Sequence, residues 1–454
     1  MTEYPLSYQQ QAMWFLTQTT RLEDQCAFDL CYRVRVAGAI DAAKLRASID
    51  RLVERHAALG AGIVFENGQL WHRQASAVPL AVFDLPNTAA ARSSAEDRAA
   101  AEARRAFQID GGPLAVFTLI RFAGNESWVL LNVHHLIADG TSIHILRRDL
   151  AALYSEADLG IPANLPQSGY GYADFVELQR RRLEGGDLKI CEQFWRATLP
   201  ANATPLEFPL DGSRPAVRSY RGAIHSITLD SSLARLCGRL SVRRQVPVSS
   251  CLLAAYVALL SRVTGERRVL IGTSFAGRRE HPSFRHCAGL FINTVPLYCD
   301  LTRIETWEAL IQNVSRVFAS AYDHQEYPLQ LLIEEHGAKR DLRKPALFQT
   351  AFNYQAAAPE SPKWGACDEL EFERVFSPTI IFDLVLHVMG LGDHITLRFD
   401  YCTDLYSPRS VKKLAEDYVD SLEQMISAIV SPSIRSRRLP PHSVREYLVG
   451  ELDE

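Results

Sequence analysis

Two adjacent histidines and a nearby aspartate carry the clearest chemistry in this sequence. The string His134-His135-Leu136-Ile137-Ala138-Asp139-Gly140 directly follows a long apolar stretch. A neutral imidazole, with an ordinary pKa of about 6.5, can accept a proton near neutral pH and so act as a general base. The spacing predicts an acyl-transfer site. The competing interpretation is a pair of core histidines followed by a turn, in which Gly140 only permits a positive φ.

A strand, a turn and a helix are expected to position this string. Apolar residues 114–122 and 128–133 are joined by a short polar segment, which predicts a hairpin of buried strands ending at the histidines. Apolar residues then recur at helical spacing from Ile143 to Leu153, with Thr141 or Ser142 as the expected N-cap. Neighbouring strand residues point to opposite sides, so we expect one histidine to be the catalyst and the other its structural partner.

Several segments together resemble one protein family. The pattern H-H-x-x-x-D-G resembles the active-site motif of condensation domains from nonribosomal peptide synthetases, members of the chloramphenicol acetyltransferase-like superfamily. Further similar segments follow in the family's order along nearly the whole chain: Tyr4-Pro5-Leu6-Ser7 with 9–14, Arg55-His56, Tyr172-Ala173-Asp174-Phe175, Phe194-Trp195, 289–296, 324–328, and Arg340-Asp341 with 345–349.

The resemblance assigns roles within the heptapeptide. It implies that His135 is the central catalytic histidine and that His134 is its structural neighbour. Asp139 would be turned away from the substrate and paired with an arginine, for which Arg278 in the string 275–279 is the expected residue. The alternative is that Arg278 and Arg279 form a solvated basic turn.

Two groups are candidates to stabilise the oxyanion that forms in acyl transfer. They are the backbone N–H of Gly140, which the resemblance also places at the active site, and the side chain of Asn293. An asparagine on a core strand can equally be satisfied by backbone groups, so the prediction for Asn293 has a structural alternative.

The second motif departs from the family pattern. The usual run R-H-E-x-L-R is here Arg55-His56-Ala57-Ala58-Leu59-Gly60, so an acid and a base are missing. His56 also shares one helical face with Leu45, Ile49 and Leu52, which makes a core-facing histidine as good an interpretation as a functional one.

Composition agrees with a soluble enzyme but does not identify one, and the length is enough for two domains with substantial cores. The chain has 454 residues, is 47% hydrophobic and carries a formal charge of -4, with no basic footprint for nucleic acid. Its nine cysteines lack zinc-like spacing, so we expect reduced thiols and no metal. No secretory signal opens the sequence, and the longest uncharged apolar stretch, residues 246–260, is shorter than the ~20 needed to cross a bilayer. We expect this stretch to form a buried core helix that ends near Gly265. We expect a cytoplasmic protein with no membrane partner.

The resemblance implies a fold and its division. We expect two chloramphenicol acetyltransferase-like α/β lobes in a V-shaped pseudo-dimer with a central tunnel. Residues 1–178 would form the N-terminal lobe with the histidine loop, and residues 179–454 the C-terminal lobe. The protein is expected to be a monomer, and the tail from Ser431 either docks a partner or frays.

The resemblance also implies an activity. The chain would transfer an acyl group from a thioester on the phosphopantetheine of an acyl or peptidyl carrier protein to an amine or hydroxyl acceptor. The acceptor would be carrier-bound or a free small molecule, and the product an amide or an ester. No carrier serine motif and no adenylation core are recognised, so a free-standing or excised enzyme without a bound cofactor is expected, with its donor on a separate carrier.

Other members of the superfamily fit less well. Epimerisation domains share the heptapeptide but carry further signatures that we do not recognise here, and heterocyclisation domains replace both histidines by aspartates. Acyltransferases that use coenzyme A share only H-x-x-x-D-G. The alternative from another class is a noncatalytic condensation-like module that recruits a carrier protein or tailoring enzyme, although such modules typically lose the histidine pair.

Overall fold

The chain divides into two compact units, each with its own sheet. The computed structural model describes residues 3–74, 77–124, 126–167, 169–201, 203–279, 281–336, 341, 343–355, 360–375, 379–391, 393–430 and 438–439. The first unit comprises Met1–Leu188, Ala276–Ile292 and Pro359–Ser377, and the second comprises Lys189–Phe275, Asn293–Ala358 and Pro378–Glu454.

This division differs from the expected continuous split at residue 178. The first unit extends to residue 188 and also includes two segments from the second half of the chain. One segment adds strands to the sheet of the first unit, and the other lies against the loop that carries Asp139, as described below. Almost all of the tail from Ser431, and Arg340 of the last matching segment, lie outside the described residues.

The first unit is built on a six-stranded mixed sheet. Its order is β12 (Lys363–Trp364), β13 (Cys367–Arg374), β2 (Asp29–Ala37), β7 (Glu126–His134), β6 (Ala115–Phe122) and β5 (Leu80–Leu85). Only β5 and β6 pair in parallel. The antiparallel pairing of β6 with β7 confirms the predicted hairpin.

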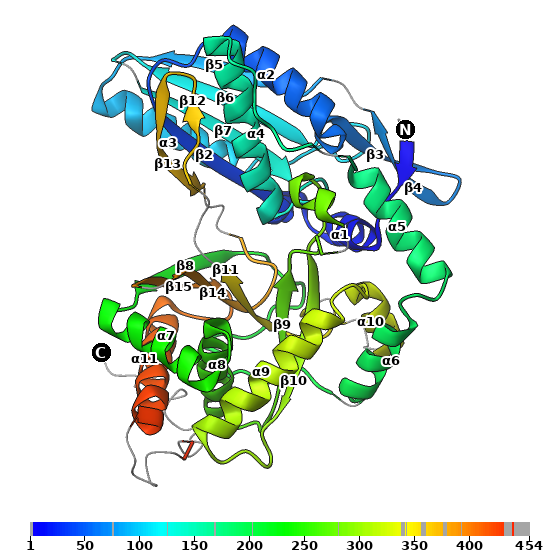
Figure 1. Cartoon of the computed structure of the whole chain (residues 1–454), viewed down its shortest axis with the longest axis vertical. Helices are drawn as coiled ribbons and strands as arrows, with labels where there is room; N and C mark the ends of the chain where they lie inside the picture. The colour runs from blue at the N-terminus through cyan, green and yellow to red at the C-terminus, as the bar shows by residue number, and fades with distance from the viewer. Residues whose placement is uncertain are drawn as a thin grey trace. The chain divides into compact units, whose positions relative to one another are not determined.

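Helices cover both faces of this sheet (Figure 1). On one face, α2 (Ala42–Arg55) and α4 (Gly140–Leu159) bury apolar residues against alternate positions of β2, β6 and β7. On the other face, α3 (Ala89–Glu102) packs small alanines against the intervening positions. A small sheet in the order β1 (Glu3–Pro5), β4 (Gln69–Gln74), β3 (Ala61–Glu66) and the helices α1 (Tyr8–Thr19) and α5 (Tyr172–Glu184) complete the unit.

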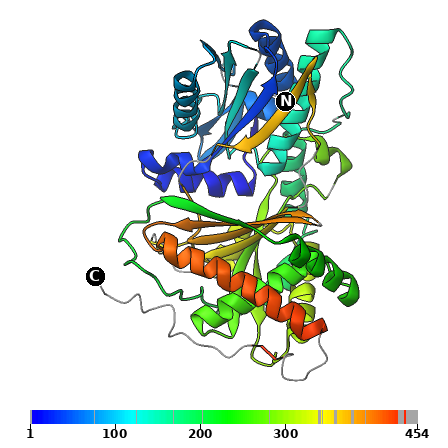
Figure 2. The ribbon, with the colours of Figure 1, turned by 90° about the vertical axis from the view of Figure 1, so that its left-hand side faces the viewer.

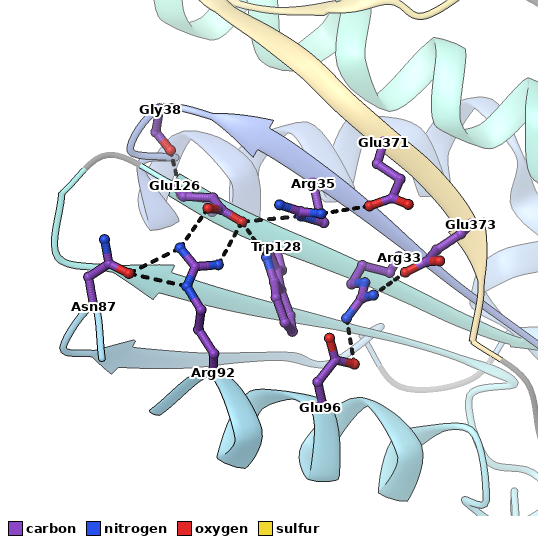
Figure 3. Close-up of polar contacts among 11 residues, drawn as sticks. Arg33, Arg35, Gly38, Asn87, Arg92, Glu96, Glu126, Trp128, Glu371 and Glu373 are labelled. Atoms are coloured by element: carbon purple, nitrogen blue, oxygen red, sulfur yellow. Dashed lines mark hydrogen bonds and ion pairs between the residues drawn. The ribbon is translucent and has the colours of Figure 1, made fainter. Parts of the chain in front are cut away.

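The sheet face under α3 carries a layer of charge (Figure 3). The Arg33 guanidinium lies over the Trp128 ring, 4.2 Å from its centroid. Ion pairs join β2, α3, β7 and β13 to one another: Arg33 with Glu96 and Glu373, Arg35 with Glu126 and Glu371, and Arg92 with Glu126. Arg33, Arg35 and Arg92 therefore each have carboxylate partners, which offsets the cost of removing their charges from water.

The second unit repeats the plan of a six-stranded sheet with helices. The sheet order is β10 (Asn293–Asp300), β9 (Arg268–Phe275), β11 (Thr350–Gln355), β14 (Leu384–Leu391), β15 (His394–Cys402) and β8 (Gly222–Thr228). The helices are α6 (Lys189–Thr198), α7 (Ser231–Arg244), α8 (Val248–Thr264), α9 (Trp307–Asp323), α10 (Leu329–His336) and α11 (Pro408–Val430). Figure 2 shows α11, orange to red, lying across this sheet.

The most apolar stretch of the sequence forms α8, a core helix whose residues are nearly all buried, as predicted. In the described residues, no single helix has the length and apolar composition needed to span a bilayer. Two consecutive helices, α7 and α8, have that length and composition only when taken together, and the bend between them is 106°.

Candidate active site

The histidine string lies where β7 gives way to α4. The N–H of His134 donates to the carbonyl of Leu114 on one side, at 2.8 Å, and the N–H of His135 donates to the carbonyl of Phe28 on the other, at 2.7 Å. The chain then turns, with the N–H of Ile137 donating to the carbonyl of His134 at 3.1 Å. Both histidines are therefore held by backbone bonds at the end of a central strand.

Asp139 is the N-cap of α4. Its Oδ1 accepts hydrogen bonds from the backbone N–H and the hydroxyl of Ser142, each at 2.8 Å. The helix begins at Gly140, so the expected cap at Thr141 or Ser142 was placed two or three residues too late. The capping carboxylate satisfies an N–H that the first turn of a helix leaves without a partner.

Asp139 also forms the ion pair expected with Arg278. The two guanidinium nitrogens lie 2.8 and 2.9 Å from the two carboxylate oxygens, and both side chains are almost fully buried. The N–H groups of Phe291 and Ile292 donate to Oδ2 at 3.0 and 3.1 Å. The alternative of a solvated turn at Arg278 is wrong.

The carboxylate of Asp139 is therefore fully engaged as a hydrogen-bond acceptor. Burial would raise its pKa, but the charge of Arg278 and the hydrogen bonds from Arg278 and Ser142 hold the pKa below its ordinary value. A carboxylate in this state anchors the loop and is poorly placed to exchange protons with a substrate.

His134 is a buried, neutral histidine. Its Nδ1 accepts a hydrogen bond from the N–H of Leu136 at 3.1 Å, and its ring lies near the rings of Phe28 and Phe107. Burial, together with the neighbouring His135, lowers the pKa of His134 to about 3. These contacts suit a structural role for His134.

His135 differs from His134 because it is only partly buried. Its Nδ1 is buried, and no side chain or backbone group of the described residues hydrogen-bonds to that atom. Burial lowers the pKa of His135, while the charge of Asp139 and the carbonyls of His135 and Ala138 act in the opposite direction. The imidazole is therefore neutral at pH 7 and able to accept a proton.

Gly140 lies exposed at the start of α4 with open space beside it. Its φ is not positive, and a Cβ placed on it would meet no atom of the described residues within 4 Å. Neither the helix nor a neighbour requires glycine here, so the alternative based on a positive φ is wrong. Its N–H belongs to the first turn of a helix, where the helix dipole favours negative charge.

Asn293 corrects one of the sequence predictions. It begins β10 and is buried, and its Nδ2 donates both hydrogens to backbone carbonyls, those of Gln325 at 2.7 Å and Tyr327 at 2.8 Å. Its Oδ1 accepts from the N–H of Leu329 at 3.3 Å. The side chain has no hydrogen left for an oxyanion, so the structural alternative holds.

The second motif forms a buried charged cluster. The carboxylate of Asp149 on α4 accepts from Arg55 Nε at 2.7 Å, His56 Nε2 at 2.9 Å and Arg148 Nε at 2.7 Å. The N–H of Ala288 donates to His56 Nδ1 at 3.4 Å, and burial lowers the pKa of His56. The core-facing interpretation of His56 is confirmed. Sequence reasoning missed Asp149, whose only signal is its place on the buried face of α4.

The opening motif meets the histidine string directly. Ser7 caps α1 in a capping box with Gln10, and the side chain of Gln10 is fully buried. Gln10 Nε2 donates to the carbonyl of Leu136 at 2.7 Å. The hydroxyl of Tyr172 lies 2.9 Å from Ser7 Oγ and donates to the carbonyl of Leu290 at 2.8 Å. The opening helix thus supports the histidine loop, and Tyr172 connects that helix to Leu290. In the described residues, no group of three His, Cys, Asp or Glu side chains is arranged to hold a metal ion.

Comparison with known proteins identifies the family. A model of the condensation domain matches residues 1–445. Malpinin synthetase of Mortierella alpina is 31% identical over 90% of this chain, and gramicidin S synthase 2 of Brevibacillus brevis is 27% identical over 93%. The aligned parts are 5% and 9% of those proteins, so the chain spans less than a tenth of these relatives.

Solved structures share the fold. The X-domain from teicoplanin biosynthesis has a TM-score of 0.84 at 21% identity, and the starter condensation domain of rhizomide synthetase has 0.80 at 20%; each comparison covers 96% of both chains. These likenesses confirm the expected α/β fold of the chloramphenicol acetyltransferase-like type. With the family model matching nearly the entire sequence, the chain belongs to the condensation domain family.

Proposed function

We propose that this chain is an acyltransferase that joins a carrier-bound acyl group to an amine or hydroxyl acceptor. Condensation domains take their substrate from the phosphopantetheine of a carrier protein and bind no cofactor of their own. The observation that carries the proposal is the neutral, partly exposed His135 beside the open N-terminus of α4.

His135 acts as the base in this proposal. The acceptor nitrogen or oxygen gives its proton to the imidazole while it attacks the thioester carbonyl, forming a tetrahedral oxyanion. The carbon–sulfur bond then breaks, and the departing thiolate takes the proton from His135. Proton transfer by a positioned side chain typically contributes about 10²–10⁴-fold to the rate.

The N-terminus of α4 stabilises the oxyanion. A Cβ placed on Gly140 would meet no atom of the described residues within 4 Å, and the positive end of the helix dipole favours negative charge developing near the Gly140 N–H. Asp139 and Arg278 hold this helix terminus relative to His135 without exchanging protons themselves. Much of the remaining rate enhancement then comes from bringing thioester and nucleophile together.

The alternative is a noncatalytic module that recruits a carrier protein or a tailoring enzyme. The likeness to an X-domain, which a solved complex pairs with OxyB, concerns the fold alone. A recruitment module has no use for a neutral imidazole held beside an open helix terminus, so the site favours catalysis.

A transfer assay tests the proposal. A cognate carrier protein is loaded with an acyl thioester and offered amine and alcohol acceptors, and the products and the carrier are read by intact mass. The proposal expects loss of the thioester only when an acceptor is present, with an amide or ester formed in equal amount. Thioester loss that does not depend on acceptor, or tight carrier binding with no transfer, would contradict it.

A further inference from the structure

Asp29 lies directly opposite His134 in the ladder between β2 and β7. The N–H of His135 donates to the carbonyl of Phe28, in the neighbouring pair of the ladder. Because hydrogen-bonded and non-hydrogen-bonded pairs alternate, Asp29 and His134 form a non-hydrogen-bonded pair. In such a pair the Cα atoms are only about 4.5 Å apart, and the side chains lie close together on one face of the sheet. Asp29 is thus an immediate neighbour of the histidine string that the proposed mechanism does not use.

Both side chains carry buried polar atoms without a partner. Asp29 and His134 are 4% and 2% exposed. Neither carboxylate oxygen of Asp29, nor Nε2 of His134, has a hydrogen-bond partner among the described residues. Buried polar groups are nearly always hydrogen-bonded in proteins, so three unsatisfied atoms on two facing residues call for an explanation.

The two sets of atoms are chemically complementary. Nδ1 of His134 accepts the N–H of Leu136, so the single proton of the neutral ring must lie on Nε2. Nε2 is therefore a donor, and the carboxylate of Asp29 offers only acceptors when it is ionised. If the proton moved to Nδ1, two donors would face each other at Leu136 and the turn that presents His135 would lose a bond.

Positive groups near Asp29 oppose the effect of burial on its carboxyl group. Burial raises the pKa of Asp29 well above its ordinary value, and the positive charges of Arg105 and Arg374 oppose this. Arg374 Nη2 also donates to the backbone carbonyl of Asp29 at 3.5 Å. The next residue of β2 on this face is Cys31, and burial raises the pKa of its thiol; Arg33 follows it on the same face.

We infer that Asp29 is a positioning residue for the histidine pair: one water molecule accepts the Nε2–H of His134 and donates in turn to a carboxyl oxygen of Asp29. This contact fixes the tautomer of His134, and the fixed ring holds the turn that carries His135. The effect on catalysis rests on the proposed function, whereas the effect on the state of His134 does not.

Nuclear magnetic resonance of protein labelled with ¹⁵N in its histidines tests the inference. His134→Gln identifies the His134 signals, and the two ring nitrogens report the tautomer. In the unaltered protein we expect one tautomer, protonated at Nε2, from pH 6 to 8. In Asp29→Ala we expect a second tautomer and faster exchange of the Nε2 proton with water. Asp29→Asn keeps an acceptor oxygen and is expected to restore the original state.

Cys31→Ala is the matched control. Cys31 is buried on the same face of β2, two residues further on and opposite Asn132. The Cys31→Ala variant should therefore leave the His134 tautomer unchanged. Asp29→Leu, which has a similar branched shape without an acceptor, serves if the alanine variant does not fold. Asp29 variants that match Cys31→Ala in tautomer and proton exchange would overturn the inference.

The transfer assay adds a second readout. We expect kcat to fall on the order of tenfold in Asp29→Ala with KM unchanged, the scale on which a residue that orients another residue acts. Asp29→Asn should recover most of this loss, and failure of that rescue would contradict the inference. If the unaltered protein transfers no acyl group, the proposed function fails, but the resonance comparison still decides the role of Asp29.

Discussion

Asp139 and Arg278 form a two-bond ion pair, and Asp139 also caps the helix that starts one residue after it. The pair joins residues 139 positions apart within one unit, with nitrogen–oxygen distances of 2.8 and 2.9 Å. The same carboxylate accepts the N–H groups of Phe291 and Ile292. One buried anion thus holds together the loop after β7, the start of α4 and segment 276–292.

Removing Arg278 should therefore lower stability and activity together. Breaking a buried pair leaves one uncompensated charge and typically costs about 3–5 kcal/mol. We expect Arg278→Ala to lower the free energy of unfolding on that scale in urea denaturation, and to reduce acyl transfer. Arg279→Ala, at the neighbouring position, which is exposed, is the control and should change neither. Unchanged melting of Arg278→Ala would rule out the anchoring role.

Substitution of Gly140 distinguishes a catalytic role of this residue from a structural one. Alanine is favoured over glycine within helices by about 1 kcal/mol, and a Cβ at Gly140 meets no atom of the described residues within 4 Å. We expect Gly140→Ala to fold with equal or greater stability in thermal unfolding, yet to lose kcat/KM, because the added methyl group obstructs approach to the N–H.

Gly238→Ala provides the comparison for that experiment. Gly238 lies within α7 and also has open space for a Cβ. We expect a similar gain in stability there and unchanged transfer. Full activity in Gly140→Ala would argue against a substrate that approaches the start of α4.

The charged layer under α3 should give the protein an acid-sensitive contribution to stability. The pKa of Glu126 is lowered to about 2 from an ordinary 4.5. The largest cause is the hydrogen bond from Arg92, and burial acts in the opposite direction. The indole of Trp128 and the charges of Arg35 and Arg92 lower the pKa further. A carboxyl group whose pKa is lower in the folded than in the unfolded state stabilises the folded state at pH values above the unfolded pKa. For Glu126 this contribution is lost as the pH falls from about 4.5 toward 2.

Urea unfolding as a function of pH checks this contribution. Glu126→Gln should be less stable at pH 7, and the difference from the unaltered protein should shrink as the pH is lowered through that window. Glu23→Gln, at an exposed site outside the layer, should show no such convergence. A difference for Glu126→Gln that does not depend on pH would show that its charge is not the source of the stability.

The sequence predicted local elements and family-level contacts well, for identifiable reasons. The hairpin of β6 and β7 and the buried helix α8 follow from continuous apolar runs, which leave a strong local pattern. The pairing of Asp139 with Arg278 came from the resemblance to condensation domains. Nothing in the local sequence around Arg278 specifies its distant partner, so composition and spacing alone could not have found it.

Other features depend on contacts that leave no local signal. Strand β13 pairs with β2 across more than three hundred residues, so a continuous division of the chain could not anticipate it. The cap at Asp139 was missed because Thr141 and Ser142 are equally good caps by residue type. Asn293 is satisfied by the backbone at Gln325 and Tyr327, which only the fold brings beside it.

The measurement that tests the central claim most directly compares two histidine variants in the transfer assay. His135→Ala removes the proposed base, and His144→Ala removes a partly buried histidine further along α4, whose pKa burial also lowers. We expect kcat to fall by about 10²-fold or more in His135→Ala and to stay within a small factor of the original in His144→Ala, with both variants folded. Equal activity of the two variants would contradict the account.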